Sequence, residues 1–188
     1  MPISPEEKNP VTGGFLDPER VVDGFSIKEG MRISDFGCGA GYFTIILAER
    51  VGSSGKVYAF DVMEAPLDTV RAKARMNHLD NIETIRADLE VLGSSGLPDQ
   101  SQDIIFLANI LFQSTKKENV VKEGSRILKK GGTMIVIDWN NQSGGFGPPN
   151  EIRPKKDDVR SIIEKEGFLF ESDLDSGKFH FGMAFKKS

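Results

Sequence analysis

The chain has 188 residues, 38% of them hydrophobic and 28% charged, and its 28 acidic residues outnumber 24 basic ones to give a net charge of -4. This length suits one domain with a buried core, and the acidic balance disfavours a dedicated DNA-binding protein, which would present a basic surface. A single cysteine excludes an internal disulfide, and the sequence has no Cys/His cluster of the kind that binds a structural metal. No apolar run approaches the ~18 residues of a membrane span. We expect a cytoplasmic monomer or homodimer.

The order of the predicted elements follows from caps, turns and hydrophobic periodicity. Residues 1–14 are polar and broken by proline, which predicts a flexible lead-in before one domain over residues 15–188. Asp17 and Pro18 predict the start of a short first helix, because Asp is a favoured cap and Pro fits the first helical position. Strands are then expected over 31–36, 56–62, 81–88, 102–109, 131–139, 168–174 and 179–185, and helices over 42–51, 66–77, 116–129 and 155–166.

This alternation of strands and helices predicts an α/β fold, a Rossmann-like doubly wound sheet of seven strands with helices on both faces. Only about four residues join the last two strands, which is too short for the crossover that parallel strands require. We therefore expect a mostly parallel sheet with an antiparallel last strand. The stretch from Asn140 to Pro154 has Gly or Pro at nearly every position from 144 to 149, which excludes regular structure and predicts a binding loop or lid.

The stretch DFGCGAGYF sets Gly37, Gly39 and Gly41 between the first predicted strand and the following helix. Glycine permits a sharp turn and a close approach of a ligand to the backbone, and the helix N-terminus offers free N–H groups. Asp61 ends the second strand twenty residues after Gly41, where a carboxylate suits the hydroxyls of a ribose. The pattern predicts a nucleoside cofactor at the carboxyl ends of the strands.

Nicotinamide-binding domains share this arrangement, so an oxidoreductase is an open alternative. Three residues disfavour it. Tyr42 stands where the GxGxxG fingerprint has its third glycine. Asp35, just before the loop, would repel a pyrophosphate but suits a cationic cofactor. Asp88 ends the third strand, where it can accept a hydrogen bond from the exocyclic amine of adenine.

With these motifs, from about Leu16 onward, the sequence resembles the class I S-adenosylmethionine-dependent methyltransferases. DFGCGAGYF is similar to that family's D/ExGxGxG loop, AFDV to its ribose-binding acid and RADLE to its adenine-contacting acid. RILKKGGTMIVIDW resembles its helix, Gly-Gly turn and fifth strand, although Lys130 stands where a proline is common. LANILFQ and FGPP resemble the small-molecule group related to the ubiquinone/menaquinone C-methyltransferases. The resemblance implies the strand order 3-2-1-4-5-7-6.

The resemblance also implies S-adenosylmethionine as cofactor, S-adenosylhomocysteine as its product and a small-molecule acceptor. Gly37, Cys38 and Gly39 would lie along the methionine part. Asp61 would hold the ribose, and Asp88 the adenine amine. The full implied cofactor set also includes the adenine-flanking Val62, Met63 and Leu89, Ala108 and Asn109 near the amino-acid end, and Asp35 and Gly41 of the loop. Cys38 near a helix N-terminus suggests a nucleophilic thiol, or simply a small residue between glycines.

Methyl transfer from a sulfonium requires alignment and exclusion of water, and a base only where the acceptor arrives protonated. Asp138, at the end of the fifth strand, is the candidate base or a carboxylate hydrogen-bonded within its loop. Candidates for acceptor contact are Phe112, Gln113, Trp139 and His180, although Trp139 and His180 also suit core packing. We expect specificity to come from the first helix, the loop after Gln113 and the Gly/Pro-rich loop. A binding module without catalysis and a protein or RNA acceptor stay open.

Overall fold

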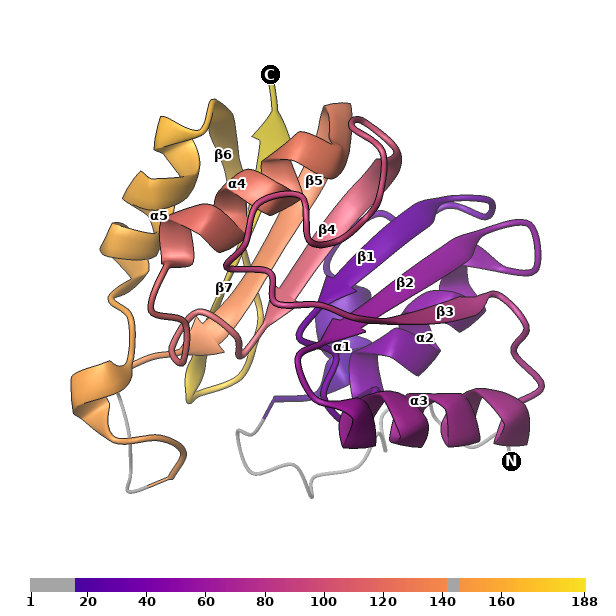
Figure 1. Ribbon diagram of the computed structural model, residues 1–188. Helices are drawn as coiled ribbons and strands as arrows, with labels where there is room; N and C mark the ends of the chain where they lie inside the picture. The colour runs from indigo at the N-terminus through magenta and orange to yellow at the C-terminus, as the bar shows by residue number, and fades with distance from the viewer. Residues whose placement is uncertain (1–15, 142–145) are drawn as a thin grey trace, which may run out of the picture.

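Seven strands form one sheet in the order β3-β2-β1-β4-β5-β7-β6 in the computed structural model, which describes residues 16–141 and 146–188 (Figure 1). Strands β1 to β5 pair in parallel, and β7 runs antiparallel to both β5 and β6. The predicted strand order and the antiparallel last strand are confirmed. The strands are β1 (Arg32–Phe36), β2 (Lys56–Asp61), β3 (Ile82–Arg86), β4 (Gln102–Ala108), β5 (Leu128–Trp139), β6 (Phe168–Leu174) and β7 (His180–Lys187).

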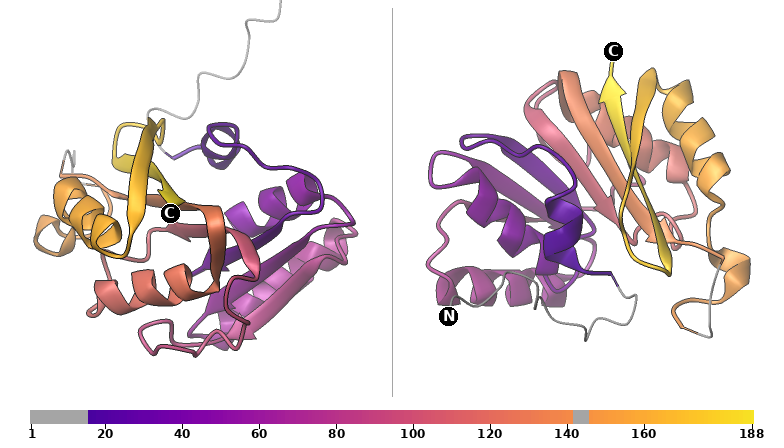
Figure 2. Two further views of the ribbon diagram at one scale, coloured as in Figure 1. Left: turned by 90° about the horizontal axis from the view of Figure 1, so that it is seen from above. Right: turned by 180° about the vertical axis from the view of Figure 1, so that it is seen from behind.

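Helices cover both faces of the sheet, as Figure 2 shows from above and behind. One face packs against α1 (Pro18–Val22), α2 (Tyr42–Val51) and α3 (Glu64–Met76), and the other against α4 (Lys117–Ile127) and α5 (Lys156–Lys165). Asp17 caps α1 as predicted, because its Oδ1 accepts hydrogen bonds from the N–H groups of Glu19 and Arg20. Among the described residues, no helix is both long enough and apolar enough to span a bilayer.

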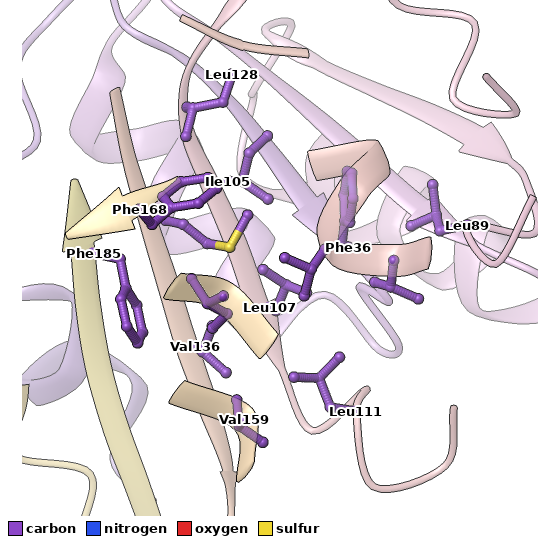
Figure 3. Packing of buried hydrophobic residues seen from close by; sticks show 14 of the residues in the cluster. Phe36, Leu89, Ile105, Leu107, Leu111, Leu128, Val136, Val159, Phe168 and Phe185 are labelled. Atoms are coloured by element: carbon purple, nitrogen blue, oxygen red, sulfur yellow. The ribbon is translucent and has the colours of Figure 1, made fainter. Parts of the chain in front are cut away.

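The core beneath α4 and α5 is built from alternate residues of neighbouring strands (Figure 3). Phe36 of β1, Leu107 of β4, Val136 of β5 and Phe185 of β7 are fully buried there, together with Val159 of α5. The intervening strand residues point to the opposite face, since side chains alternate along a strand. Consecutive buried residues over 134–137 confirm the prediction that β5 is covered on both faces.

Most predicted boundaries shift by one to three residues in the structure. Strand β3 ends at Arg86, so Asp88 lies two residues beyond the strand that it was predicted to end. Helix α4 ends at Ile127 instead of residue 129, because Leu128 is extended and pairs with Gln102 ahead of a register shift in β5. Helix α3 begins at Glu64, two residues before the predicted start, since Pro66 fits within a first turn. The loop predicted to be wholly irregular contains one 3-10 turn, Asn150–Ile152. The predicted lead-in over residues 1–14 lies outside the described residues.

Candidate functional site

A cavity of about 810 Å³ opens at the carboxyl ends of β1, β2, β3 and β4. It spans the point between β1 and β4 where the winding of the sheet reverses, which is where open α/β sheets bind ligands. The start of α1 contributes Leu16 and Pro18, as expected for the first helix. Twelve of the seventeen predicted site residues line the cavity: Asp35, Gly37, Cys38, Gly39, Asp61, Val62, Met63, Asp88, Leu89, Ala108, Asn109 and Gln113.

The three glycines after β1 serve different purposes, although all have positive φ. A Cβ added at Gly39 would meet nothing within 4 Å, and Gly39 lines the cavity, so a ligand can approach the backbone there. A Cβ at Gly37 would lie 3.0 Å from Ile110, and one at Gly41 only 2.7 Å from Val70 of α3. Gly41 does not line the cavity. The predicted role of a cofactor contact therefore fits Gly39, whereas Gly41 serves the packing of α2 against α3.

Asp61 is fixed at the cavity wall by the backbone on both sides of it. Its Oδ2 accepts a hydrogen bond from the Gly39 N–H at 3.2 Å, and its Oδ1 accepts one from the Met63 N–H at 3.0 Å. The carboxylate is half-buried and lines the cavity. Because each carboxylate oxygen has a further lone pair, Asp61 can still accept hydrogen bonds from a ligand that carries two neighbouring hydroxyls.

Asp35 and Cys38 lie behind Asp61 in a buried acidic cluster. Asp35 is 2% exposed, and its Oδ2 accepts a hydrogen bond from the Thr44 hydroxyl at 2.6 Å. Burial raises the pKa of Asp35 to about 7 and the nearby Asp61 adds to the rise, although the Thr44 bond opposes it. Burial, Asp35 and Asp61 together raise the pKa of the Cys38 thiol. Cys38 is therefore a neutral thiol at physiological pH, which fits a small packing residue and not a nucleophile.

The cavity is lined by acidic side chains and by no basic ones among the described residues. Its described lining contains four acidic residues, Asp35, Asp61, Asp88 and Glu90, and no lysine, arginine or histidine. An anion such as a pyrophosphate would be repelled here without a compensating donor side chain, whereas a cation would be attracted. The cavity therefore favours a positively charged ligand.

Apolar side chains flank the far end of the cavity, near the ends of β2 and β3. Val62 and Met63 are more than half exposed, whereas Leu89 is 4% exposed. Asp88 is exposed beside them, and its Oδ1 accepts a hydrogen bond from the Glu90 N–H at 3.0 Å. A flat apolar ring with a polar edge fits such a slot.

The end of β4 adds an amide oxygen without a partner. Asn109 lies in the left-handed region with a φ of 56°, and its Oδ1 is buried with no hydrogen-bond partner among the described residues. The Gln113 Nε2 donates to the Asn109 backbone carbonyl at 3.1 Å, which ties the following loop to the strand end. An orphaned acceptor beside an acid-lined cavity is a further place for a ligand N–H group.

Five predicted site residues do not line the cavity: Gly41, Phe112, Asp138, Trp139 and His180. Asp138 is fully buried and accepts hydrogen bonds from the N–H groups of Phe112 at 3.1 Å and Trp139 at 2.8 Å. Burial nevertheless raises its pKa to about 6. Because Asp138 is fully buried and does not line the cavity, it fixes the turn after β4 and is not placed to take a proton from an acceptor in this cavity.

Trp139 and His180 pack under the Gly/Pro-rich loop. Their ring centroids are 4.1 Å apart, and the Arg153 guanidinium lies 5.3 Å from the Trp139 ring. Arg153 donates to the carbonyls of Asn140 and Pro148, and a Cβ at Gly147 would lie 2.5 Å from the Trp139 ring. The described part of the loop is thus fastened over Trp139, and the packing interpretation of Trp139 and His180 fits the structure better than acceptor contact.

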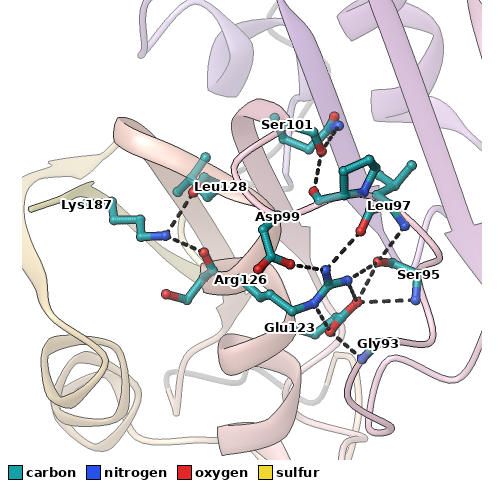
Figure 4. Close-up of polar contacts among 12 residues, drawn as sticks. Gly93, Ser95, Leu97, Asp99, Ser101, Glu123, Arg126, Leu128 and Lys187 are labelled. Atoms are coloured by element: carbon teal, nitrogen blue, oxygen red, sulfur yellow. Dashed lines mark hydrogen bonds and ion pairs between the residues drawn. The ribbon is translucent and has the colours of Figure 1, made fainter.

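A second carboxylate network fixes the long coil between β3 and β4 (Figure 4). Glu123 of α4 is fully buried and accepts hydrogen bonds from the N–H groups of Gly93 at 2.7 Å and Ser95 at 3.2 Å. Arg126 donates to Glu123 and to the Leu97 carbonyl at 2.9 Å. Although burial opposes ionisation, the bonds from Arg126 and Ser95 lower the pKa of Glu123 to about 2. The coil that holds Asp88 and Leu89 is therefore well anchored without any helix.

Sequence reasoning missed several residues that line the cavity. Most lie one or two positions from a predicted site residue, so a prediction that included the sequence neighbours of each site residue would identify them. Glu90 was part of the RADLE motif but received no role. The missed residues are Ala40, Tyr42, Phe43, Pro66, Ala87, Glu90, Ile110, Ser114 and Val120.

Comparisons with known proteins agree with this geometry. Residues 27–169 match a family model described as a methyltransferase domain. The ubiquinone/menaquinone biosynthesis C-methyltransferase UbiE of a Shewanella strain is 30% identical over 155 residues, which cover 81% of this chain and 58% of that protein. The chain thus spans less than two thirds of that relative's length.

Two solved structures are similar over most of their length. A SAM-dependent methyltransferase from Aquifex aeolicus has 30% identity and a TM-score of 0.85, with 96% of this chain and 94% of that one covered. A protein from Sulfolobus solfataricus described as a type 11 methyltransferase has 31% identity and a TM-score of 0.69, with 83% of each chain covered. The sheet and its helices are therefore shared with solved methyltransferase structures.

Proposed function

The chain belongs to the methyltransferase domain family, and from this premise we propose that it binds S-adenosylmethionine in the cavity at the strand ends and methylates a small molecule. The observation that supports this ligand most strongly is the four-acid lining with no basic side chain among the described residues. A nicotinamide dinucleotide has a pyrophosphate that this lining would repel, whereas S-adenosylmethionine is a sulfonium cation. The acidic lining therefore favours the methyltransferase over the oxidoreductase alternative.

The residues present fit this cofactor. Asp61 would accept hydrogen bonds from the two ribose hydroxyls, and Asp88 from the adenine amine. The side chains of Met63 and Leu89 would flank the adenine ring. The open backbone at Gly39 and the unpartnered Oδ1 of Asn109 would face the methionine part.

When bound, S-adenosylmethionine supplies an electrophilic methyl group on a cationic sulfur, so the protein needs chiefly to bind, align and exclude water. The first helix and the loop after β4 would enclose the acceptor, since Leu16, Phe43 and Ile110 line the cavity with Gln113 beside them. This mixture of apolar side chains and one amide suits a weakly polar small molecule. The names of the UbiE relatives favour carbon as the methylated atom, and we include this in the proposal.

Ligand binding tests the cofactor. Thermal shift of the full chain with S-adenosylhomocysteine, and separately with NADH at the same concentration, should give a rise in Tm only for the former, because a ligand stabilises the folded state that binds it. A rise with NADH alone would overturn the proposal.

Catalysis needs its own assay. Transfer of a radiolabelled methyl group should be measured over a panel of small phenols, quinols and other weakly polar acceptors, with protein and RNA acceptors as further arms. Label in a small molecule supports the proposal. Label only in protein or RNA would change the acceptor class, and cofactor binding without transfer to any acceptor would favour a binding module.

A further inference from the structure

The coil after β3 touches the cavity at one end and the loop after β4 at the other. Asp88 and Leu89 lie on the cavity side. The Asp88 carbonyl accepts hydrogen bonds from the Val91 N–H at 3.0 Å and the Ser94 hydroxyl at 2.6 Å, and its side chain accepts from the Glu90 N–H. The backbone of Glu90 is thus fixed to the residue proposed to read the adenine amine.

The side chain of Glu90 contacts the loop between β4 and α4. Its Oε1 accepts hydrogen bonds from the Ser114 hydroxyl at 2.8 Å and the Thr115 N–H at 2.7 Å, and its Oε2 accepts from the Thr115 hydroxyl at 2.8 Å. The Glu90 carbonyl accepts a further bond from the Asn119 side chain at 2.9 Å. Glu90 therefore joins its own coil to the loop before α4 by three hydrogen bonds and to the first turn of α4 by a fourth.

These bonds hold the residues just before helix α4. The cap residue is Lys116, whose side chain makes no capping bond to the first N–H groups of the helix. The Glu90 carboxylate accepts from the Thr115 N–H immediately before the cap, which places its negative charge near the positive end of the helix dipole. Although burial opposes ionisation, the bonds from Ser114, Thr115 and the Lys116 N–H lower the pKa of Glu90 to about 2.

The loop that Glu90 holds also reaches the acceptor side of the cavity. Ser114 and Gln113 both line the cavity, and Gln113 is bonded to the end of β4. A shift of the coil after β3 would therefore displace the loop between β4 and α4 through the hydrogen bonds of Glu90. Glu123 holds the same coil further along but contacts neither Ser114 nor Thr115 in the described structure.

We infer that Glu90 is a positioning residue that couples the two ends of the site: occupation of the adenine side orders the loop and the first turn of α4 that face the acceptor. The inference rests on the proposed function, because it needs an adenosyl ligand against Asp88 and Leu89. It assigns to Glu90 no contact with the reacting atoms. Coupling of this kind must be reciprocal, so its loss also weakens binding of the ligand.

Hydrogen exchange with S-adenosylhomocysteine as the probe tests the coupling. In the unaltered chain, saturating ligand should slow amide exchange in residues 88–97 and also in 112–121, each by about tenfold or more. In Glu90→Gln, which keeps the shape but removes the charge and turns an acceptor into a donor, residues 88–97 should still be protected and 112–121 should not. The dissociation constant should rise by about three- to tenfold.

The controls separate coupling from a general loss of structure. Glu118→Gln removes an exposed negative charge from the first turn of the same helix at a residue that makes no side-chain bond to the coil after β3 in the described structure, and should behave as the unaltered chain does. Thr115→Val removes the hydroxyl bond to the Glu90 Oε2 and leaves the backbone bond, so it should reduce protection of 112–121 by less than Glu90→Gln does.

The possible failures are distinguishable. Protection of 88–97 without protection of 112–121 in the unaltered chain would overturn the inference and leave the proposed function intact. Retention of full protection in Glu90→Gln, or its loss in Glu118→Gln, would also overturn it. No protection in either segment would overturn the proposed function together with the inference.

Discussion

Asp61 at the end of β2 and Asp138 at the end of β5 both accept hydrogen bonds from two backbone N–H groups, yet only Asp61 lines the cavity. Around Asp61 the backbone at Gly39 leaves open space. Around Asp138 the chain folds back through Phe112 and buries the carboxylate completely. Two acids near strand ends at the same edge of the sheet thus acquire different surroundings, one lining the cavity and one fixing a turn.

The same contrast holds for the two halves of the sheet edge. The ends of β1, β2 and β3 surround the cavity, whereas at the end of β5 and the start of β7 the rings of Trp139 and His180 pack together beside Arg153. A strand-end position in the sequence therefore predicts that an acid lies at this edge of the sheet. Whether the acid can bind a ligand depends on the segment that packs beside it.

The largest effect should come from the acid that faces the cavity. Asp61→Ala should weaken binding of S-adenosylhomocysteine by about 10- to 100-fold, because hydrogen bonds to a charged group are lost together with the anchor for Gly39. Isothermal titration calorimetry measures this. Asp138→Asn is the matched control and should leave the affinity unchanged, and an equal loss in both variants would contradict the contrast between the two acids.

The next effect separates two glycines of one loop. Gly41→Ala should lower the free energy of unfolding by about 3 kcal/mol, because a methyl group would combine a positive φ with a 2.7 Å approach to Val70. Gly39→Ala should cost only about 1 kcal/mol, since its surroundings are open, but should impair ligand binding. Urea unfolding and calorimetry on both variants provide the comparison, and equal loss of stability would refute it.

The pH dependence of stability should reveal Asp35. Its raised pKa means that the folded state prefers the neutral acid, so this preference is fully present below about pH 4 and is lost as the pH rises through about 7. Asp35→Asn should therefore gain stability relative to the unaltered chain across this window, on the order of 2 kcal/mol at pH 8. Thermal unfolding of both proteins from pH 4 to 8 measures the difference, and a constant gap would contradict it.

The smallest effect should come from His180, with the opposite sign. Burial and the nearby Arg153 lower its pKa from 6.5 to about 4, so the folded state prefers neutral imidazole, and stability is lost as the pH falls from 6.5 towards 4. His180→Gln should remove this loss, which we expect to be about 1 kcal/mol at pH 5. Denaturant unfolding at pH 5 and 7.5 checks it. A gap that grows at the higher pH would show that the imidazole is not buried as described.

The sequence was sufficient for the fold and for the open half of the site. A buried run sets the strand end at Asp61, Asp88 follows two residues after the partly exposed β3, and parallel strands bring both positions to one edge of the sheet. The rest depends on long-range contacts that no local pattern encodes: Asp138 accepts from a backbone N–H 26 residues away, and Glu90 accepts from one 25 residues away. Periodicity predicted where Trp139 and His180 lie but not the loop that covers them.

The central claim is that an adenosyl ligand lies across the ends of β1, β2 and β3, and a crystal structure of the full chain with S-adenosylhomocysteine tests it most directly. We predict electron density for the ligand in the cavity, with the ribose hydroxyls on Asp61 and the adenine between Met63 and Leu89. Ligand bound elsewhere, or a cavity that stays empty at saturating ligand, would contradict the account.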